Sequence, residues 1–323
     1  MKEQNGIVLE MDTAGIKRAV ALLHAGEVVA FPTETVYGLG ADATNDIAVA
    51  RIFEAKQRPQ FNPLIVHFTN AGAVWSETEP SETAKTLADA FWPGPLTLVV
   101  QRKTDCRLSP LVSAGLESVA VRVPAHAGAQ QLLNSTGRPL AAPSANRSGS
   151  ISPTSAHHVF LSLGNKIPLI LDGGACDVGL ESTIVDVTED RPVILRPGGI
   201  SIDELQHAVG GTVERFSDGA KQNGNAPKSP GQLLSHYAPS APVRLSAQNV
   251  EPGEVLLGFG PVDQAALNLS PSGDLVEAAA NLFSMLHTLD AMHPSRIAVS
   301  PIPDTGLGEA INDRLQRASA PRS

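Results

Sequence analysis

The chain has 323 residues, 42% hydrophobic and 18% charged, which is typical of a globular protein long enough for two domains. A formal net charge of -9 argues against broad, non-specific binding to nucleic acid. We expect no signal peptide and no membrane span, because the sequence has neither a basic-then-apolar N-terminal segment nor an apolar run of about 20 residues. Cys106 and Cys176 lack metal-binding spacing, so we expect reduced thiols in a cytoplasmic protein.

In the first two thirds of the chain, predicted strands alternate with predicted helices. This alternation favours an α/β domain with a mixed, twisted sheet. The predicted strands are 7–9, 28–31, 64–68, 96–101, 118–123, 140–142, 168–171, 183–187 and 192–195. The predicted helices begin after Asp12 or Thr13, after Asn45 or Asp46, at Ser81, near Pro153 or Thr154, and after a capping box at Ser201.

The alternation stops after residue 210, where Gly, Asn, Lys, Ser and Pro dominate. We therefore predict a first domain at 1–210, a linker at 211–241 and a small α/β domain at 242–323. Two motifs interrupt the linker, Ser229-Pro230-Gly231 and Ser235-His236-Tyr237-Ala238-Pro239. The small domain is predicted to have strands 243–245, 255–259 and 297–299 and helices 275–289 and 306–317.

The candidate chemistry is concentrated between Phe31 and Phe68. A buried strand is followed by the hydroxyl-rich turn Thr33–Gly40, and ligands of α/β proteins bind beyond the carboxyl ends of strands. The rest of this stretch supplies two cations, an amide and an imidazole, which are Lys56, Arg58, Asn62 and His67. Such a group predicts a site for a phosphorylated, polar ligand.

A second polar loop, Pro143–Gly149, precedes the helix expected near Ser152-Pro153-Thr154, whose free N–H groups would bind an anion. Together with Lys56 and Arg58, Arg147 and Arg196 lie next to loops and would supply the charge that a triphosphate needs. No P-loop and no Gly-x-Gly-x-x-Gly motif is present.

Each candidate also has a plain structural interpretation. A single Lys or Arg is more often a solvated charge, and a lone His67 on an apolar strand is more often a core residue. Arg122 is either a rim charge or a ligand anchor. His157 and His158 are read as structural or exposed, and Ser144 lacks the Gly-x-Ser-x-Gly context of a nucleophile. Three carboxylates could act as acids or bases without forming a paired signature, namely Glu34, Asp172 and Glu181.

Several motifs, in one order along the chain, resemble the YrdC-like threonylcarbamoyl-AMP synthases in their long, two-domain form. They are PTETVYGLG at 32–40, Lys-x-Arg-Pro at 56–59, Asn-Pro-Leu at 62–64, APSAN at 142–146 and SPT at 152–154. The match runs from about Gly15 to Gly210 and resumes from Ser229 to Pro239. The resemblance implies a YrdC-like twisted mixed sheet with helices, followed by a smaller Rossmann-like α/β domain.

The resemblance also implies an activity. Members of the family join L-threonine, bicarbonate and ATP into L-threonylcarbamoyl-adenylate and release pyrophosphate, for the threonylcarbamoyladenosine modification of tRNA. Such a reaction requires positioning and charge neutralisation rather than a protein nucleophile. Mg²⁺ is expected to arrive on the phosphates. A separate tRNA threonylcarbamoyl-transferase complex is the expected downstream partner, with at most weak direct binding of tRNA.

The family's site residues can be carried over onto matching positions. Lys56 and Arg58 are then the expected catalytic cations. The residues expected to face ATP are Lys56, Arg58, Asn62, Ser118, Ser144, Ser152, Arg196 and Tyr237. Those expected to line the L-threonine pocket are Thr35, Tyr37, His67, Arg122, Ala142 and Ser182, with Arg122 as the partner of the carboxylate. The linker departs from the pattern, since it reads SPGQLLSHYAP where many relatives have Met and a basic residue after the Gly.

Two other functions fit the sequence less well. An RNA-binding module is disfavoured by the acidic balance and by the lack of interleaved aromatic residues. The carbamoyl-transfer module of hydrogenase maturation shares the domain, but that protein adds acylphosphatase and zinc-finger segments. This chain has neither the length nor the cysteines for them.

Overall fold

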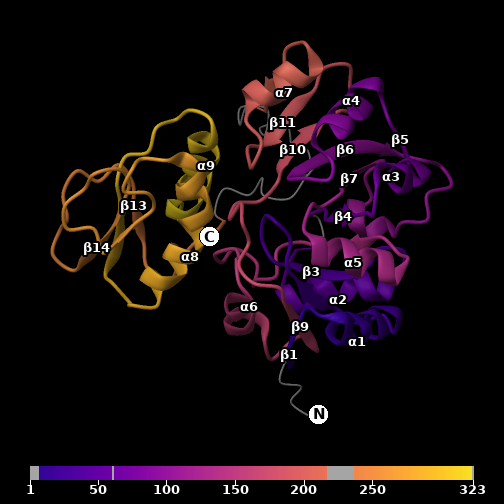
Figure 1. The fold of residues 1–323 in the computed structure, drawn as a ribbon, viewed down its shortest axis with the longest axis horizontal. Helices are drawn as coiled ribbons and strands as arrows, with labels where there is room; N and C mark the ends of the chain where they lie inside the picture. The colour runs from indigo at the N-terminus through magenta and orange to yellow at the C-terminus, as the bar shows by residue number, and fades with distance from the viewer. Residues whose placement is uncertain (1–6, 60–61, 217–235, 322–323) are drawn as a thin grey trace.

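The computed structural model describes residues 7–59, 62–216 and 236–321, which form two α/β domains (Figure 1). The first domain is built on a mixed, 12-stranded sheet. Its strand order is β1-β9-β2-β3-β8-β4-β7-β6-β10-β11-β12, with β5 paired to β6. The strands are β1 (Ile7–Glu10), β2 (Val29–Phe31), β3 (Gly38–Asp42), β4 (Ile65–His67), β5 (Thr78–Glu79), β6 (Leu96–Arg102), β7 (Ser118–Arg122), β8 (Leu140–Ala141), β9 (Leu169–Asp172), β10 (Thr183–Asp186), β11 (Val193–Arg196) and β12 (Glu214–Arg215).

Helices cover this sheet and begin where side chains cap them. The helices are α1 (Thr13–His24), α2 (Asp46–Lys56), α3 (Ala71–Glu77), α4 (Glu82–Phe91), the 3-10 helix η1 (Pro110–Ser113), α5 (Ala127–Thr136), α6 (Ala156–Leu163) and α7 (Ile202–Val209). Asp12 caps α1 and Asn45 caps α2, which decides between the two candidates at each start. Ser81 caps α4, and the predicted capping box of Ser201 and Glu204 is present.

The structure corrects two boundaries near the candidate site. The hydroxyl-rich turn ends at Tyr37, because Gly38–Asp42 forms β3, antiparallel to β2. The helix expected near Ser152 begins only at Ala156, with Ser155 as its cap. The Ser152 hydroxyl instead donates to the carboxylate of Glu181, 2.5 Å away, so it does not cap a helix and the predicted helix start is wrong, while the anion site expected there stays a prediction.

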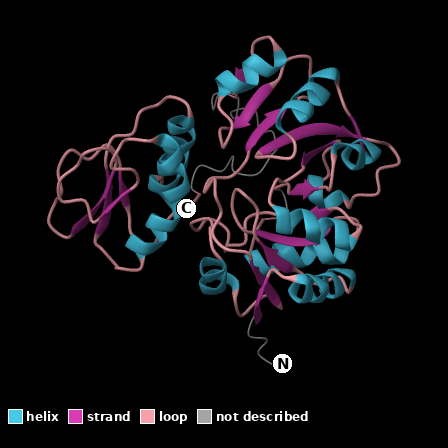
Figure 2. Ribbon diagram, in the orientation of Figure 1, coloured by secondary structure: helices cyan, strands magenta, loops and turns pink. Residues whose placement is uncertain are grey.

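The second domain has a four-stranded, all-parallel sheet in the order β13-β16-β14-β15. Its elements are β13 (Val243–Arg244), β14 (Glu254–Gly258), β15 (Leu267–Asn268), α8 (Leu275–Asp290), β16 (Arg296–Val299) and α9 (Leu307–Ser319). Both helices lie on the side that faces the first domain (Figure 2). The predicted α/β fold with a second, smaller α/β domain is thereby confirmed, while β3, β5, β12, β15, α3, η1 and α5 were not predicted.

The two domains share a hydrophobic core. Leu282, Phe283 and Leu286 of α8 belong to a cluster that also contains Val36 and Leu180 of the first domain. Within the predicted linker, β12 continues the first sheet beside β11, and Ala238 pairs with Ser150. The motif Ser229-Pro230-Gly231 and Ser235 lie outside the described residues. No helix in the described part of the chain is long and apolar enough to cross a membrane.

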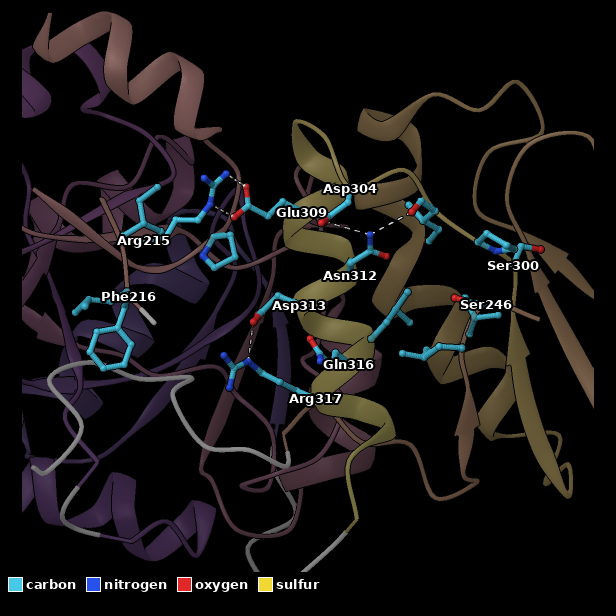
Figure 3. Close-up of a pocket in the computed structure, with 18 residues that line it drawn as sticks. Arg215, Phe216, Ser246, Ser300, Asp304, Glu309, Asn312, Asp313, Gln316 and Arg317 are labelled. Carbon is cyan, nitrogen blue, oxygen red and sulfur yellow. Dashed lines mark hydrogen bonds and ion pairs between the residues drawn. The ribbon is translucent and has the colours of Figure 1, made fainter. Parts of the chain in front are cut away.

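Polar contacts also join the domains across a cavity of about 540 Å³ (Figure 3). Arg215 of β12 binds both carboxylate oxygens of Glu309 on α9, at 2.8 Å each. At another point His158 of α6 stacks on His287 of α8, with ring centroids 4.0 Å apart. The Nε2 atom of His287 lies 3.1 Å from the backbone oxygen of Ser152.

The stacked histidines predict a pH-dependent stability. Burial, and then the neighbouring His287, lowers the pKa of His158 to about 4. A histidine in the unfolded chain has a pKa of about 6.5. Between about pH 6.5 and pH 4 the unfolded chain therefore binds protons that the folded chain does not, and the folded state loses stability as the pH falls. His67 and His236, with pKa values of about 3, act in the same direction.

We therefore expect the thermal unfolding temperature to fall between about pH 6.5 and pH 4. In the variant His158→Phe, which keeps an aromatic ring but cannot titrate, the decrease should be smaller. Calorimetric unfolding at several pH values checks this expectation. Identical slopes for the two proteins would contradict the contribution of the histidine pair.

Candidate active site

Segments that are distant in the sequence surround a small, largely buried cavity of about 50 Å³ in the first domain. They are the turn after β2, the end of α2, the loop after β8, the segment before β10, the end of β11 and the end of the predicted linker. The lining residues are Thr35, Val36, Arg58, Ile65, Arg122, Pro143, Ser144, Glu181, Ser182, Arg196, His236 and Tyr237. The cavity therefore lies at the carboxyl ends of several strands, as the sequence predicts.

The turn after β2 is held by its own hydroxyl groups. The Thr33 Oγ1 atom donates to the carbonyl of Val36 at 2.7 Å and accepts from the backbone N–H groups of Thr35 and Val36. It also lies 2.8 Å from Thr35 Oγ1. These bonds orient the Thr35 hydroxyl toward Arg122, whose Nη1 donates to it at 2.8 Å. The hydroxyl-rich motif is thus a rigid turn that presents one threonine to the cavity.

Arg122 is buried, so it is not a rim charge, and its role as a ligand anchor stays a prediction. It ends β7 between β4 and β6, and its Nη2 atom forms an ion pair of 2.7 Å with Glu34. Burial acts to raise the pKa of Glu34, but the charge of Arg122 outweighs it and holds that pKa below its ordinary value. A carboxylate beside a fixed guanidinium is therefore present at neutral pH.

His67 lies next to Arg122 in the register of β4 and β7, and 3% of its surface is exposed. Burial, and then the charge of Arg122, lowers the pKa of His67 to about 3. The imidazole is therefore neutral at physiological pH and offers a hydrogen bond without a charge.

Three further cations are buried in this region, and two of them, Arg58 and Arg196, line the cavity. The Lys56 Nζ atom donates to the carbonyl of Ser144 at 2.5 Å and to that of Asn146, while Arg58 donates to the carbonyl of Pro63 at 3.0 Å. Arg196 donates to the carbonyl of Ser182 at 2.9 Å.

All three cations are buried, and burial is the main cause that lowers the pKa of each, to about 10 for Arg58. Within the described ranges, none forms an ion pair with a carboxylate. Desolvated cations held by carbonyl groups favour an anionic ligand.

Tyr237 closes the cavity. It has 1% of its surface exposed and a positive φ of 62°, and the next residue, Ala238, donates its N–H to the carbonyl of Gly149 at 2.9 Å. With this segment in place the cavity has room for one or two water molecules, at about 30 Å³ each in the liquid. In this conformation the cavity is smaller than a nucleotide.

Comparison with known proteins places the chain in a family. A model of the Sua5, YciO and YrdC proteins, described as telomere recombination, matches residues 21–198. A model described as the C-terminal domain of threonylcarbamoyl-AMP synthase matches residues 200–320. The threonylcarbamoyl-AMP synthase of Bacillus subtilis (strain 168) is 42% identical over 95% of this chain and 93% of its own length. The chain belongs to the two-domain threonylcarbamoyl-AMP synthases.

Two archaeal comparisons support this family assignment. The threonylcarbamoyl-AMP synthase of Pyrococcus abyssi is 42% identical over 95% of this chain and 94% of its own length. The crystal structure of P. abyssi Sua5 complexed with L-threonine has a TM-score of 0.88 and 38% identity, covering 97% of this chain and 96% of that one. The resemblance noted in the sequence is confirmed over both domains.

The structure brings together about half of the residues carried over from the synthase motifs. Those that line the cavity are Thr35, Arg58, Arg122, Ser144, Ser182, Arg196 and Tyr237. A further group is buried without lining it, namely Lys56, Asn62, His67, Ala142 and Ser152. The Tyr37 hydroxyl donates to the carbonyl of Gly174, and Ser118 begins β7, the strand that Arg122 ends. The functional roles of all these residues stay predictions.

Two residues near this synthase site were given no role from the sequence, His236, which was named only as part of the linker motif, and Arg314, which was not named. His236 lines the cavity. Arg314 of α9 is fully buried and binds Glu181, which also lines it. A signal for Arg314 exists in the helix, because it lies three residues from buried Ile311 and four from buried Ala318.

Proposed function

We propose that this chain catalyses the synthesis of threonylcarbamoyl-AMP from L-threonine, bicarbonate and ATP, with release of pyrophosphate, for the threonylcarbamoyladenosine modification of tRNA. The observation that carries the proposal is the arrangement of the cavity. A fixed guanidinium, Arg122, lines the cavity together with two desolvated cations, Arg58 and Arg196. An amino acid carboxylate and a triphosphate need several fixed cations at a short distance from one another.

The proposed roles follow from these contacts. Arg122 binds the carboxylate of L-threonine, and Thr35 and Ser182 offer hydroxyl groups beside it. Arg58 and Arg196 bind the phosphates. The amine of threonine and bicarbonate form a carbamate with loss of water, and a carbamate oxygen attacks the α-phosphorus of ATP. The bond from that phosphorus to the bridging oxygen breaks and pyrophosphate leaves, so the protein needs only to position the reactants and neutralise charge.

Magnesium is proposed to enter with ATP as part of the substrate. Among the described residues, no group of three or more His, Cys, Asp or Glu side chains could hold a metal ion. Mg²⁺ commonly binds to substrate phosphates with few protein ligands. The proposal also includes a cytoplasmic location and a separate transferase complex that consumes the adenylate.

The test is the release of pyrophosphate from ATP, measured with L-threonine and bicarbonate each present or withheld. We expect release only when both are present, and none after removal of Mg²⁺ with EDTA. Release that does not depend on L-threonine would contradict the proposed reaction. Binding of ATP without threonine-dependent release would leave a nucleotide-binding module.

A further inference from the structure

The second domain places one charged side chain beside the active site. Arg314 of α9 has 0% of its surface exposed. Its Nε atom donates to Glu181 Oε2 at 2.8 Å, and its Nη1 atom donates to Asp313 at 2.7 Å. Its guanidinium carbon lies 5.3 Å from the centre of the Tyr237 ring, within the range of a cation–π contact. Its Nη2 atom has no hydrogen-bond partner among the described residues.

Glu181 connects this arginine to residues expected to bind ATP. It lines the cavity, and its second oxygen, Oε1, accepts the hydroxyl proton of Ser152 at 2.5 Å. The next residue, Ser182, accepts hydrogen bonds from Arg196 through both its carbonyl and its hydroxyl. Arg314 is therefore linked to Ser152 through Glu181 and is in direct contact with Tyr237.

The charges explain why this position needs a cation. Burial acts to raise the pKa of Glu181, but Arg314 first and Arg196 second outweigh it and hold that pKa below its ordinary value. Without Arg314, the buried carboxylate would either take up a proton or depend on Arg196 alone. Either change would disturb the hydroxyl of Ser152 or the cation that is proposed to bind the phosphates.

We propose that Arg314 is a positioning residue for ATP, through which the second domain takes part in the active site. The inference rests on the proposed function. Arg314 holds Glu181, which in turn holds the Ser152 hydroxyl and leaves Arg196 available for phosphate, and its cationic face fixes the ring of Tyr237. Glu309 lies on the same helix as Arg314 and pairs with Arg215 of β12 (Figure 3). This pair is more exposed than Arg314 and joins the two domains away from the cavity that Glu181 lines.

The test compares Arg314→Met, which keeps the length of the side chain without its charge, with Arg215→Met as the matched control. We expect the Kd for ATP, measured by calorimetric titration, to rise about 10- to 100-fold in Arg314→Met, as for the loss of one charged hydrogen bond. The KM for L-threonine should change less than about twofold. In Arg215→Met both constants should stay within about twofold of the wild type.

The pH profile separates positioning from general stability. In Arg314→Met the acidic decline of kcat/KM for ATP should move to higher pH, because Glu181 loses the cation that keeps it ionised. A purely structural role would lower the folded fraction without moving this decline. An unshifted profile together with an ATP affinity within twofold of the wild type would overturn the proposal.

If Arg314→Met does not fold, the double variant Glu181→Gln/Arg314→Met decides, because it removes both buried charges together. It should fold, bind ATP as weakly as described and lack the acidic decline, whereas wild-type affinity would overturn the proposal. A wild-type protein that binds no ATP would refute this inference and the proposed function alike. One that binds ATP without threonine-dependent release would refute only the function.

Discussion

Replacement of Arg58 by Ala is expected to reduce pyrophosphate release about 100- to 1000-fold or more, while the protein stays folded. The side chain lines the cavity and its guanidinium is desolvated, with its pKa lowered to about 10 by burial. In such a surrounding, a fixed positive charge stabilises the transition state far more than it would in water, and loss of one such donor costs about this factor in known enzymes. The measurement is the rate of threonine-dependent pyrophosphate release at saturating ATP.

Arg51→Ala is the control, because Arg51 lies on α2, which ends two residues before Arg58, and does not line the cavity. It pairs with Glu27 at 2.9 Å and donates to the carbonyl of Gly26. We expect its rate to stay within about twofold of the wild type. If Arg58→Ala, folded by circular dichroism, kept more than a tenth of the wild-type rate, Arg58 would not be a catalytic cation.

Lys56→Ala would test the Lys-x-Arg motif less clearly than Arg58→Ala. The Lys56 Nζ atom holds the carbonyl groups of Ser144 and Asn146, so Lys56→Ala would leave two buried acceptors without a donor. A lower activity in that variant would mix a disturbed loop with a lost charge. Arg58 therefore gives the clearer test of the proposed role of the Lys-x-Arg motif.

Local patterns predicted the elements of the fold well, because caps and strand signals depend on neighbouring residues. Asp12, Asn45, Ser81 and Ser201 all cap the helices expected after them. The order of the strands was beyond reach, since pairs such as β1 with β9 join residues more than 150 positions apart. A local pattern carries no information on such pairing.

The start of α6 illustrates the same limit within the site. Ser152 and Ser155 are both suitable caps in the sequence, and Pro153 favours the earlier start. In the fold the Ser152 hydroxyl is used by Glu181, and Glu181 is held by Arg314 of the second domain. Ser152 is thus linked through Glu181 to a residue that lies 162 positions later in the chain, which no local pattern reveals.

Arg122→Gln is expected to weaken L-threonine binding at least about 100-fold. Three contacts fix the guanidinium, which are the ion pair with Glu34 and the hydrogen bonds to the Thr35 hydroxyl and the Gly94 carbonyl, and Arg122 lines the cavity. The substitution removes the proposed partner of the carboxylate in a buried site, where a charged hydrogen-bonded pair contributes about 2–5 kcal/mol or more to binding. Calorimetric titration with L-threonine measures the change in affinity. An unaltered affinity for ATP would show that the substitution affects the binding of L-threonine alone.

The same substitution separates binding from stability. Arg122→Gln leaves Glu34 buried without its cation, which costs about 3–5 kcal/mol of folding free energy. Arg122→Lys keeps the charge but lacks the forked donor, so we expect it to recover most of the stability and little of the affinity. Arg102→Gln is the control, because Arg102 ends neighbouring β6 and donates to Ser113 and Leu108 instead. L-Threonine affinity that recovers fully in Arg122→Lys would reduce Arg122 to a counter-charge for Glu34.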